Sequence, residues 1–180
     1  MSDWQQASRK RIEVMTHARI REFPRGFDWV WLACDRDDHV AAFITGGAGP
    51  IPTAILESSL PAEESEALIR RLAPTTTAHA SISHGGVESF IALAQRGVFV
   101  YDWQDVHRPS ARYTHLYELV AAPREPVRVE LFHGELAQLS RIVRLDNASF
   151  ADEMAVDVCR HTQCIADYQE MAKPASGEHS

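Results

Sequence analysis

Acidic side chains gather in two short segments, residues 35–38 and 102–105, and both could bind a basic partner. The second segment also holds a tryptophan, which we expect to be at least partly exposed. An exposed aromatic ring surrounded by carboxylates is a good anchor for a basic protein. The side chains that we predict to contact a partner are Asp35, Asp37, Asp38, Asp102, Trp103 and Asp105, with further acids in residues 146–157.

Histidines offer a second kind of chemistry, because imidazole and carboxylate groups together bind zinc, manganese or iron. Of the nine histidines, His79 and His84 lie in one polar segment, and His107 and His115 lie near the acids at 102–105. Their spacing matches no metal motif, and H-E-x-x-H is absent. We therefore predict no metal site, unless the fold brings His79, His84 and His107 together.

Other catalytic signals are weak. Cys159 and Cys164 bracket His161, but no second cysteine pair completes a zinc site. Three cysteines also make no disulfide framework, which fits a reducing compartment. The chain has no G-x-S-x-G nucleophile motif, and the glycine-rich residues 46–49 lack the register of a phosphate loop. Residues 35–38 lack the glycine and glutamate of a calcium loop. We predict no catalytic residue and no cofactor.

The overall charge supports a protein partner. The 180 residues carry 18 Lys+Arg and 25 Asp+Glu, a formal net charge of −7. A general nucleic-acid binder needs a basic face, so we expect no nucleic-acid binding. An acidic surface can instead steer a basic protein. No apolar run approaches the roughly 20 residues that span a bilayer, and the charged N-terminus does not resemble an export signal. We expect a cytoplasmic protein that does not enter membranes.

The elements that must position these residues alternate along the chain. An apolar run at 29–34, an Asp-rich turn at 35–38 and a second apolar run at 39–45 predict a β-hairpin. Apolar spacing predicts a helix over 87–94, ended by Gly97. The other predicted elements are an amphipathic helix at 3–22 within an N-terminal unit 1–24, a loop at 46–52, an extended piece at 53–57, a helix opening near 61 and ending near 72, a loop at 74–85, strands at 98–101, 112–120, 127–132 and 150–158, a helix at 136–143, and a disordered tail at 172–180.

This order of elements predicts an α+β protein with a mixed, largely antiparallel sheet and helices mainly on one face. We expect residues 1–171 to form a single domain, because no linker long enough to divide them is present.

Residues 31–52, WLACDRDDHVAAFITGGAGPIP, resemble a segment of bacterial immunity proteins from polymorphic toxin systems. The shared pattern is an aromatic–aliphatic strand, an Asp-rich turn, a V-A-x-F strand and a G-x-G-x-x-P exit. It is similar to the SUKH-type superfamily and to small proteins encoded beside type VI secretion effectors. Asp38 stands where that pattern often has glycine.

The resemblance implies a cytoplasmic protein that binds and blocks a cognate toxin or effector and catalyses nothing itself. A nuclease toxin would present a basic surface that an acidic inhibitor can cover. The alternative function is a metal-dependent hydrolase that uses the loop histidines. The sequence leaves the identity of the toxin and the oligomeric state open.

Overall fold

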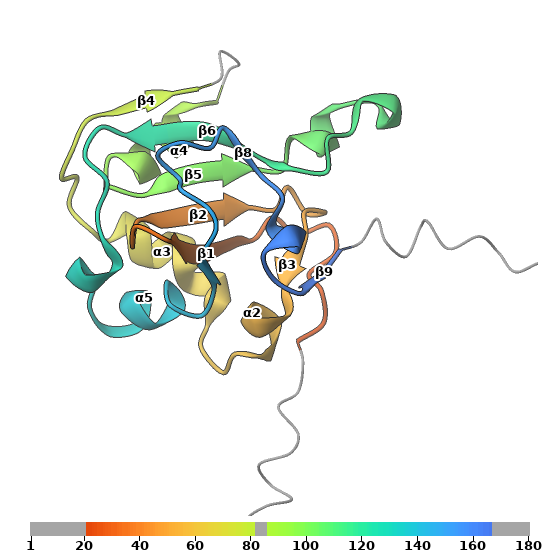
Figure 1. The fold of residues 1–180 in the computed structure, drawn as a ribbon. Helices are drawn as coiled ribbons and strands as arrows, with labels where there is room; N and C mark the ends of the chain where they lie inside the picture. The colour runs from red at the N-terminus through yellow and green to blue at the C-terminus, as the bar shows by residue number, and fades with distance from the viewer. Residues whose placement is uncertain (1–20, 82–85, 167–180) are drawn as a thin grey trace, which may run out of the picture.

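The computed structural model describes residues 21–81 and 86–166. These residues form an α+β fold, as predicted, with a mixed and mostly antiparallel sheet (Figure 1). The strands are β1 (Val30–Asp35), β2 (Val40–Ile44), β3 (Ile51–Pro52), β4 (Ala78–Ala80), β5 (Phe99–Asp102), β6 (Tyr117–Pro123), β7 (Arg144–Leu145), β8 (Ala155–Val156) and β9 (Cys164–Ile165). The α-helices are α2 (Thr53–Glu57), α3 (Ser65–Arg70), α4 (Glu88–Ala94) and α5 (Gly134–Leu139), and the 3₁₀ turns are η1 (Ala62–Glu64), η2 (Gln104–His107), η3 (Ser110–Arg112), η4 (Val129–Leu131) and η5 (Val158–Arg160).

The main sheet has the strand order β4-β6-β5-β2-β1-β7, and β8 also pairs with β6. The predicted hairpin is confirmed, because β1 and β2 pair antiparallel on either side of the Asp-rich turn. β2 then pairs with β5 in parallel. As a result the turn lies at one end of these central strands, and the segment after β5 leaves from the other end (Figure 1).

An aromatic row crosses the middle of the sheet. Trp31 pairs with Phe43, which pairs with Tyr101 on the next strand, so the three side chains share one face. Their rings stack with centroid separations of 4.3 Å and 5.2 Å. Phe150 covers this row, and the Tyr101 hydroxyl donates a hydrogen bond of 2.7 Å to the Glu153 carbonyl. The segment between β7 and β8 is thereby fixed across the aromatic face, where Figure 1 shows it passing in front of the sheet.

Glycine at position 97 ends α4, as predicted, with a backbone φ of 87°. A side chain at this position would collide with Val127, since an added Cβ would lie 2.1 Å from a Val127 methyl carbon. The turn from α4 into β5 therefore requires glycine for its conformation and for the close packing of the chain after β6.

Several predicted elements take a different form. Residues 53–57 form the helix α2 rather than an extended piece, with Pro52 fixing the backbone just before its first turn. Residues 127–132 contain η4 rather than a strand, and the predicted loop 74–85 contains β4. The predicted strand 112–120 begins only at Tyr117 and continues to Pro123 as β6, and within the predicted strand 150–158 only Ala155–Val156 form a strand, β8.

The predicted N-terminal helix and the predicted tail lie almost wholly outside the described residues. The last part of unit 1–24, residues 21–24, is described and is not helical. Within residues 21–81 and 86–166, no helix is both long and apolar enough to cross a membrane.

Candidate functional site

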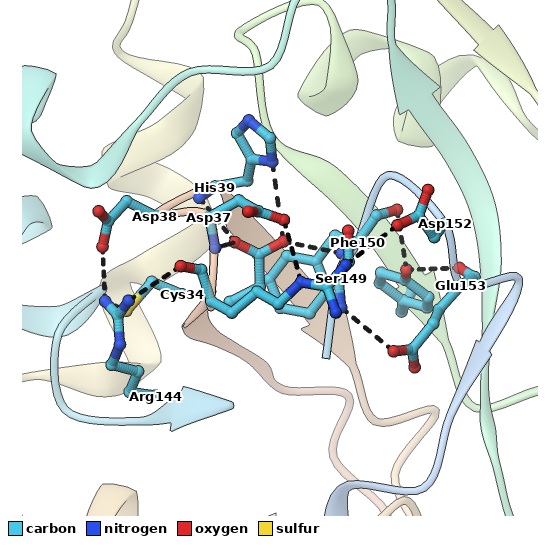
Figure 2. Close-up of polar contacts among 12 residues, drawn as sticks. Cys34, Asp37, Asp38, His39, Arg144, Ser149, Phe150, Asp152 and Glu153 are labelled. Carbon is cyan, nitrogen blue, oxygen red and sulfur yellow. Dashed lines mark hydrogen bonds and ion pairs between the residues drawn. The ribbon is translucent and has the colours of Figure 1, made fainter. Parts of the chain in front are cut away.

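The turn between β1 and β2 is organised around the buried carboxylate of Asp35, which is 0% exposed. Its Oδ1 accepts hydrogen bonds of 2.9 Å from the backbone N–H groups of Asp37 and His39. Its Oδ2 accepts a 2.7 Å bond from the backbone N–H of Phe150. One side chain therefore shapes the turn and also ties it to the segment that covers the aromatic face (Figure 2).

Asp38 adopts a left-handed conformation with φ of 64°. Glycine adopts this conformation most readily, and aspartate is one of the few other residues that tolerate it. Its carboxylate lies 2.5 Å from Arg144, whose guanidinium also lies 2.7 Å from Asp146. The hydrogen bond from Arg144 holds the pKa of Asp38 below its usual value. Arg144 belongs to β7, so this pairing joins the turn to the edge of the sheet.

Exposed carboxylates from two distant parts of the chain meet beside this turn. Arg36 lies 3.5 Å from Asp37 and 3.4 Å from Asp152. Arg144 forms ion pairs with Asp38 and Asp146 in the same way. We call the exposed carboxylates Asp37, Asp38, Asp146 and Asp152 the acidic face; their side chains are 44%, 37%, 73% and 71% exposed. The four exposed carboxylates outnumber the two arginines that bridge them, and Arg128 and Arg141 add positive charge on the Asp38 side of the face.

The same turn also brings together three groups that could hold a metal ion. Ligand atoms of Asp35, Asp37 and His39 all lie within 4.8 Å of one another. His39 Nδ1 is 3.7 Å from Asp35 Oδ2, and it is buried with no hydrogen-bond partner among the described residues (Figure 2). The sequence analysis did not single out His39, although the D-x-D-x-H spacing of residues 35–39 was a visible signal. Asp35 already accepts three N–H groups, which accounts for its burial without an ion.

The second predicted group, Asp102, Trp103 and Asp105, lies at the opposite end of the sheet. Asp102 pairs with Ile44 at the last position of β2, whereas the turn precedes the first. Because β2 has five residues, the two ends are on the order of 15 Å apart at about 3.3 Å per residue. The structure therefore does not combine the six predicted residues into one surface.

The expectation that Trp103 is partly exposed is wrong, since only 3% of its surface is accessible. Its ring packs against Tyr117 with centroids 5.1 Å apart. Asp105 is also 3% exposed, and it accepts hydrogen bonds of 2.9 Å and 2.8 Å from the backbone N–H groups of Thr114 and His115. These side chains hold the base of the segment that projects between β5 and β6, drawn in green in Figure 1. We call residues 103–116 the arm.

Asp102 is a buried acid, with an accessible fraction of 6%. Burial raises the pKa of its carboxyl to about 6, and the nearby carboxylate of Asp28 raises it further, while a hydrogen bond from Gln104 opposes the shift. Burial also raises the pKa of Asp28, whose carboxylate accepts a 2.9 Å bond from the backbone N–H of Gly46. Because Asp102 is buried, its carboxyl offers almost no surface for a basic partner to contact.

The loop histidines do not form a metal cluster in the described residues. His79 pairs with Ala122 near the end of β6, whereas His115 lies two residues before Tyr117, where β6 begins. The seven residues of β6 span roughly 20 Å. His107 lies in η2 of the arm, and His84 lies outside the described residues.

No protein-family model, no curated protein and no solved structure matches the chain.

Proposed function

We propose that this protein binds and neutralises a cognate bacterial toxin or effector by covering a basic surface of that partner with the acidic face. The observation that carries the proposal is the convergence of Asp37 and Asp38 with Asp146 and Asp152 on one surface. The first two residues lie more than a hundred positions before the last two in the sequence, so it is the fold that brings them together.

The acidic face is held in place before any partner arrives. Asp35 fixes the turn through three backbone hydrogen bonds, and Arg144 links Asp38 to Asp146. A surface that is already ordered loses less conformational entropy on binding. Preorganised carboxylates therefore support tight occlusion rather than a transient contact.

The charge of the face defines the chemistry of the partner. Negative surfaces accelerate encounters with basic proteins and repel nucleic acid. A nuclease toxin has a basic substrate site, which this face would occupy in place of the nucleic acid. Under this proposal the protein works in the cytoplasm, where such a toxin acts, and needs no cofactor.

Co-expression with the toxin or effector encoded by the neighbouring gene tests the function directly. We expect protection from toxicity and a stable complex that survives size-exclusion chromatography. Toxicity that persists together with failure to isolate a complex would contradict the proposal.

A pair of charge-matched double variants tests the surface. Asp146→Asn with Asp152→Asn removes two carboxylates from the acidic face, and we expect the association rate constant to fall about tenfold at low salt. Glu57→Gln with Glu88→Gln removes two exposed carboxylates from α2 and α4 and is the control. Surface plasmon resonance at several salt concentrations measures both. Equal rate constants for the two double variants would assign binding to another surface.

The alternative function, a metal-dependent hydrolase, receives little support from the geometry of the loop histidines. Among the described residues, the group that could hold a metal ion is Asp35, Asp37 and His39. The hydrolase hypothesis used the loop histidines as ligands and none of these three residues. Stoichiometric metal in the purified protein that is lost in His39→Gln would favour this alternative.

A further inference from the structure

The chain reverses sharply between η5 and β9, close to the last described residue. The carbonyl of Val158 accepts hydrogen bonds of 3.1 Å from the N–H groups of both His161 and Thr162. β9 then pairs antiparallel with β3, placing Cys164 opposite Pro52. The reversal brings Cys159 and Cys164, five positions apart, back toward each other.

The two cysteines are thiols, and their side chains contact one another through a hydrogen bond. Both are half-buried and pack against the hydrophobic core. Cys164 Sγ also lies 3.6 Å from the carbonyl of Thr162. The hydrogen bond with Cys159, followed by burial, raises the pKa of the Cys164 thiol.

Cys34 is in a different environment. It is 2% exposed on β1, with its Sγ 3.7 Å from the carbonyl of Val143. Burial raises the pKa of its thiol, so it is both inaccessible and poorly nucleophilic. The protein therefore contains two neighbouring, partly exposed thiols, and the buried thiol of Cys34 serves as an internal comparison for their reactivity.

We propose that Cys159 and Cys164 form a redox-active pair that a small-molecule disulfide, such as glutathione disulfide, converts to an intramolecular disulfide. This modification site is independent of the acidic face and of the proposed function. It rests on the turn that brings the two residues together, on the contact between their sulfur atoms and on their partial exposure.

The reaction balances as thiol–disulfide exchange. The Cys159 thiolate attacks one sulfur of glutathione disulfide, forming a mixed disulfide and releasing one glutathione. Cys164 then loses its proton and attacks the Cys159 sulfur, which forms the protein disulfide and releases the second glutathione. The two protein thiols are oxidised, the glutathione disulfide is reduced, and the two thiol protons end on the two released glutathiones. Cys159 attacks first because the raised pKa of the Cys164 thiol keeps Cys164 protonated.

The disulfide would close a ring that contains the whole reversal between η5 and β9. Such a covalent link limits local opening of this segment. The segment is otherwise held to β3 by a short ladder and by the 2.8 Å bond from the Thr53 N–H to the Gln163 carbonyl.

Peptide mapping tests the proposal in the full-length, folded protein. The protein is incubated with glutathione disulfide at mildly alkaline pH, its remaining thiols are alkylated, and it is digested with trypsin. Trypsin cleaves after Arg160, between the two cysteines. We expect the peptide that ends at Arg160 to stay linked to the peptide that begins at His161 until a reductant is added, and Cys34 to react only after denaturation.

The single variants Cys159→Ser and Cys164→Ser complete the test. We expect no linked peptides from either, and a persistent glutathione adduct on the cysteine that remains in Cys164→Ser. In the wild-type protein, stable glutathione adducts without linked peptides would overturn the proposal, and so would two thiols that stay fully alkylatable after oxidation. The wild-type result is decisive even if a variant fails to fold.

Discussion

Removal of the Asp35 carboxylate would leave three backbone N–H groups without their acceptor, including that of Phe150 in the buried core. An unsatisfied buried donor costs about 1–3 kcal/mol. The role of Asp35 is therefore to hold the turn, whereas its neighbour Asp37 is available to a partner.

Asp35→Ala separates these roles. We expect it to lower the free energy of unfolding by about 2–4 kcal/mol, because the lost hydrogen bonds are largely shielded from water. The control Asp37→Ala removes an exposed carboxylate from the same turn, and we expect a change within about 0.5 kcal/mol. Urea denaturation measures both. Equal losses of stability would show that the turn does not depend on the buried carboxylate.

At the scale of elements, the arm depends on Asp105 in a similar way. The carboxylate fastens the far side of the arm through the N–H groups of Thr114 and His115. Arg108 provides a second contact, a bidentate ion pair in which its two terminal nitrogens lie 2.5 Å and 2.7 Å from the carboxylate oxygens of Glu118. These contacts explain how a segment that projects from the sheet keeps a defined shape.

Asp105→Ala should loosen the arm while the sheet stays intact. We expect faster limited tryptic cleavage after Arg112, which is exposed in η3, with little change in the circular dichroism spectrum. Ser110→Ala alters an exposed side chain in the same 3₁₀ turn and is the control. Cleavage of Asp105→Ala at the wild-type rate would mean that the Arg108–Glu118 pair is sufficient to hold the arm.

The elements that local pattern predicts are those with their own hydrophobic periodicity. The β1–β2 hairpin and α4 have such patterns, and both are confirmed. Residues 127–132 alternate like a strand, yet they form only one antiparallel bridge, between Arg128 and His39, and then turn into η4. β3 and β9 are two residues each and exist only as partners of one another, so nothing local indicates them.

In the candidate functional site, too, the sequence predicts the features that have a local signal and misses those that depend on distant residues. The Asp-rich turn was visible in the sequence, because aspartate is a common turn residue. The burial of Asp35 and Asp105 was not, because it depends on donors from distant positions: Phe150 for the first, and Thr114 and His115 for the second. When such partners are unknown, residues 102–105 look like an exposed polar loop. The prediction that Trp103 is exposed was wrong for this reason.

At the scale of the whole molecule, the two ends of the sheet respond differently to pH. The acidic face is solvated, whereas Asp102 is buried at the opposite end with a pKa of about 6. The usual aspartate pKa is about 3.9 in an unfolded chain. Folding is therefore opposed by the ionised form of Asp102, and this penalty reaches its full size when the pH is well above 6. As the pH falls from about 6 toward 4, the folded state takes up the proton first, so this contribution to stability increases.

Asp102→Asn removes the penalty and should make stability less dependent on pH. We expect the variant to unfold at higher urea concentration than the wild-type protein at pH 8, by about 2 kcal/mol in the free energy of unfolding, and the difference to shrink toward pH 4. Asp152→Asn, on the exposed acidic face, is the control and should have a small effect at both pH values. A complex formed through the acidic face should keep its dissociation constant in Asp102→Asn, because that side chain lies at the other end of β2. A gain in stability with unchanged binding would show that Asp102 affects folding and that recognition occurs at the other end of the sheet. A stability difference between variant and wild type that grows as the pH falls would contradict the assignment of the buried charge to Asp102.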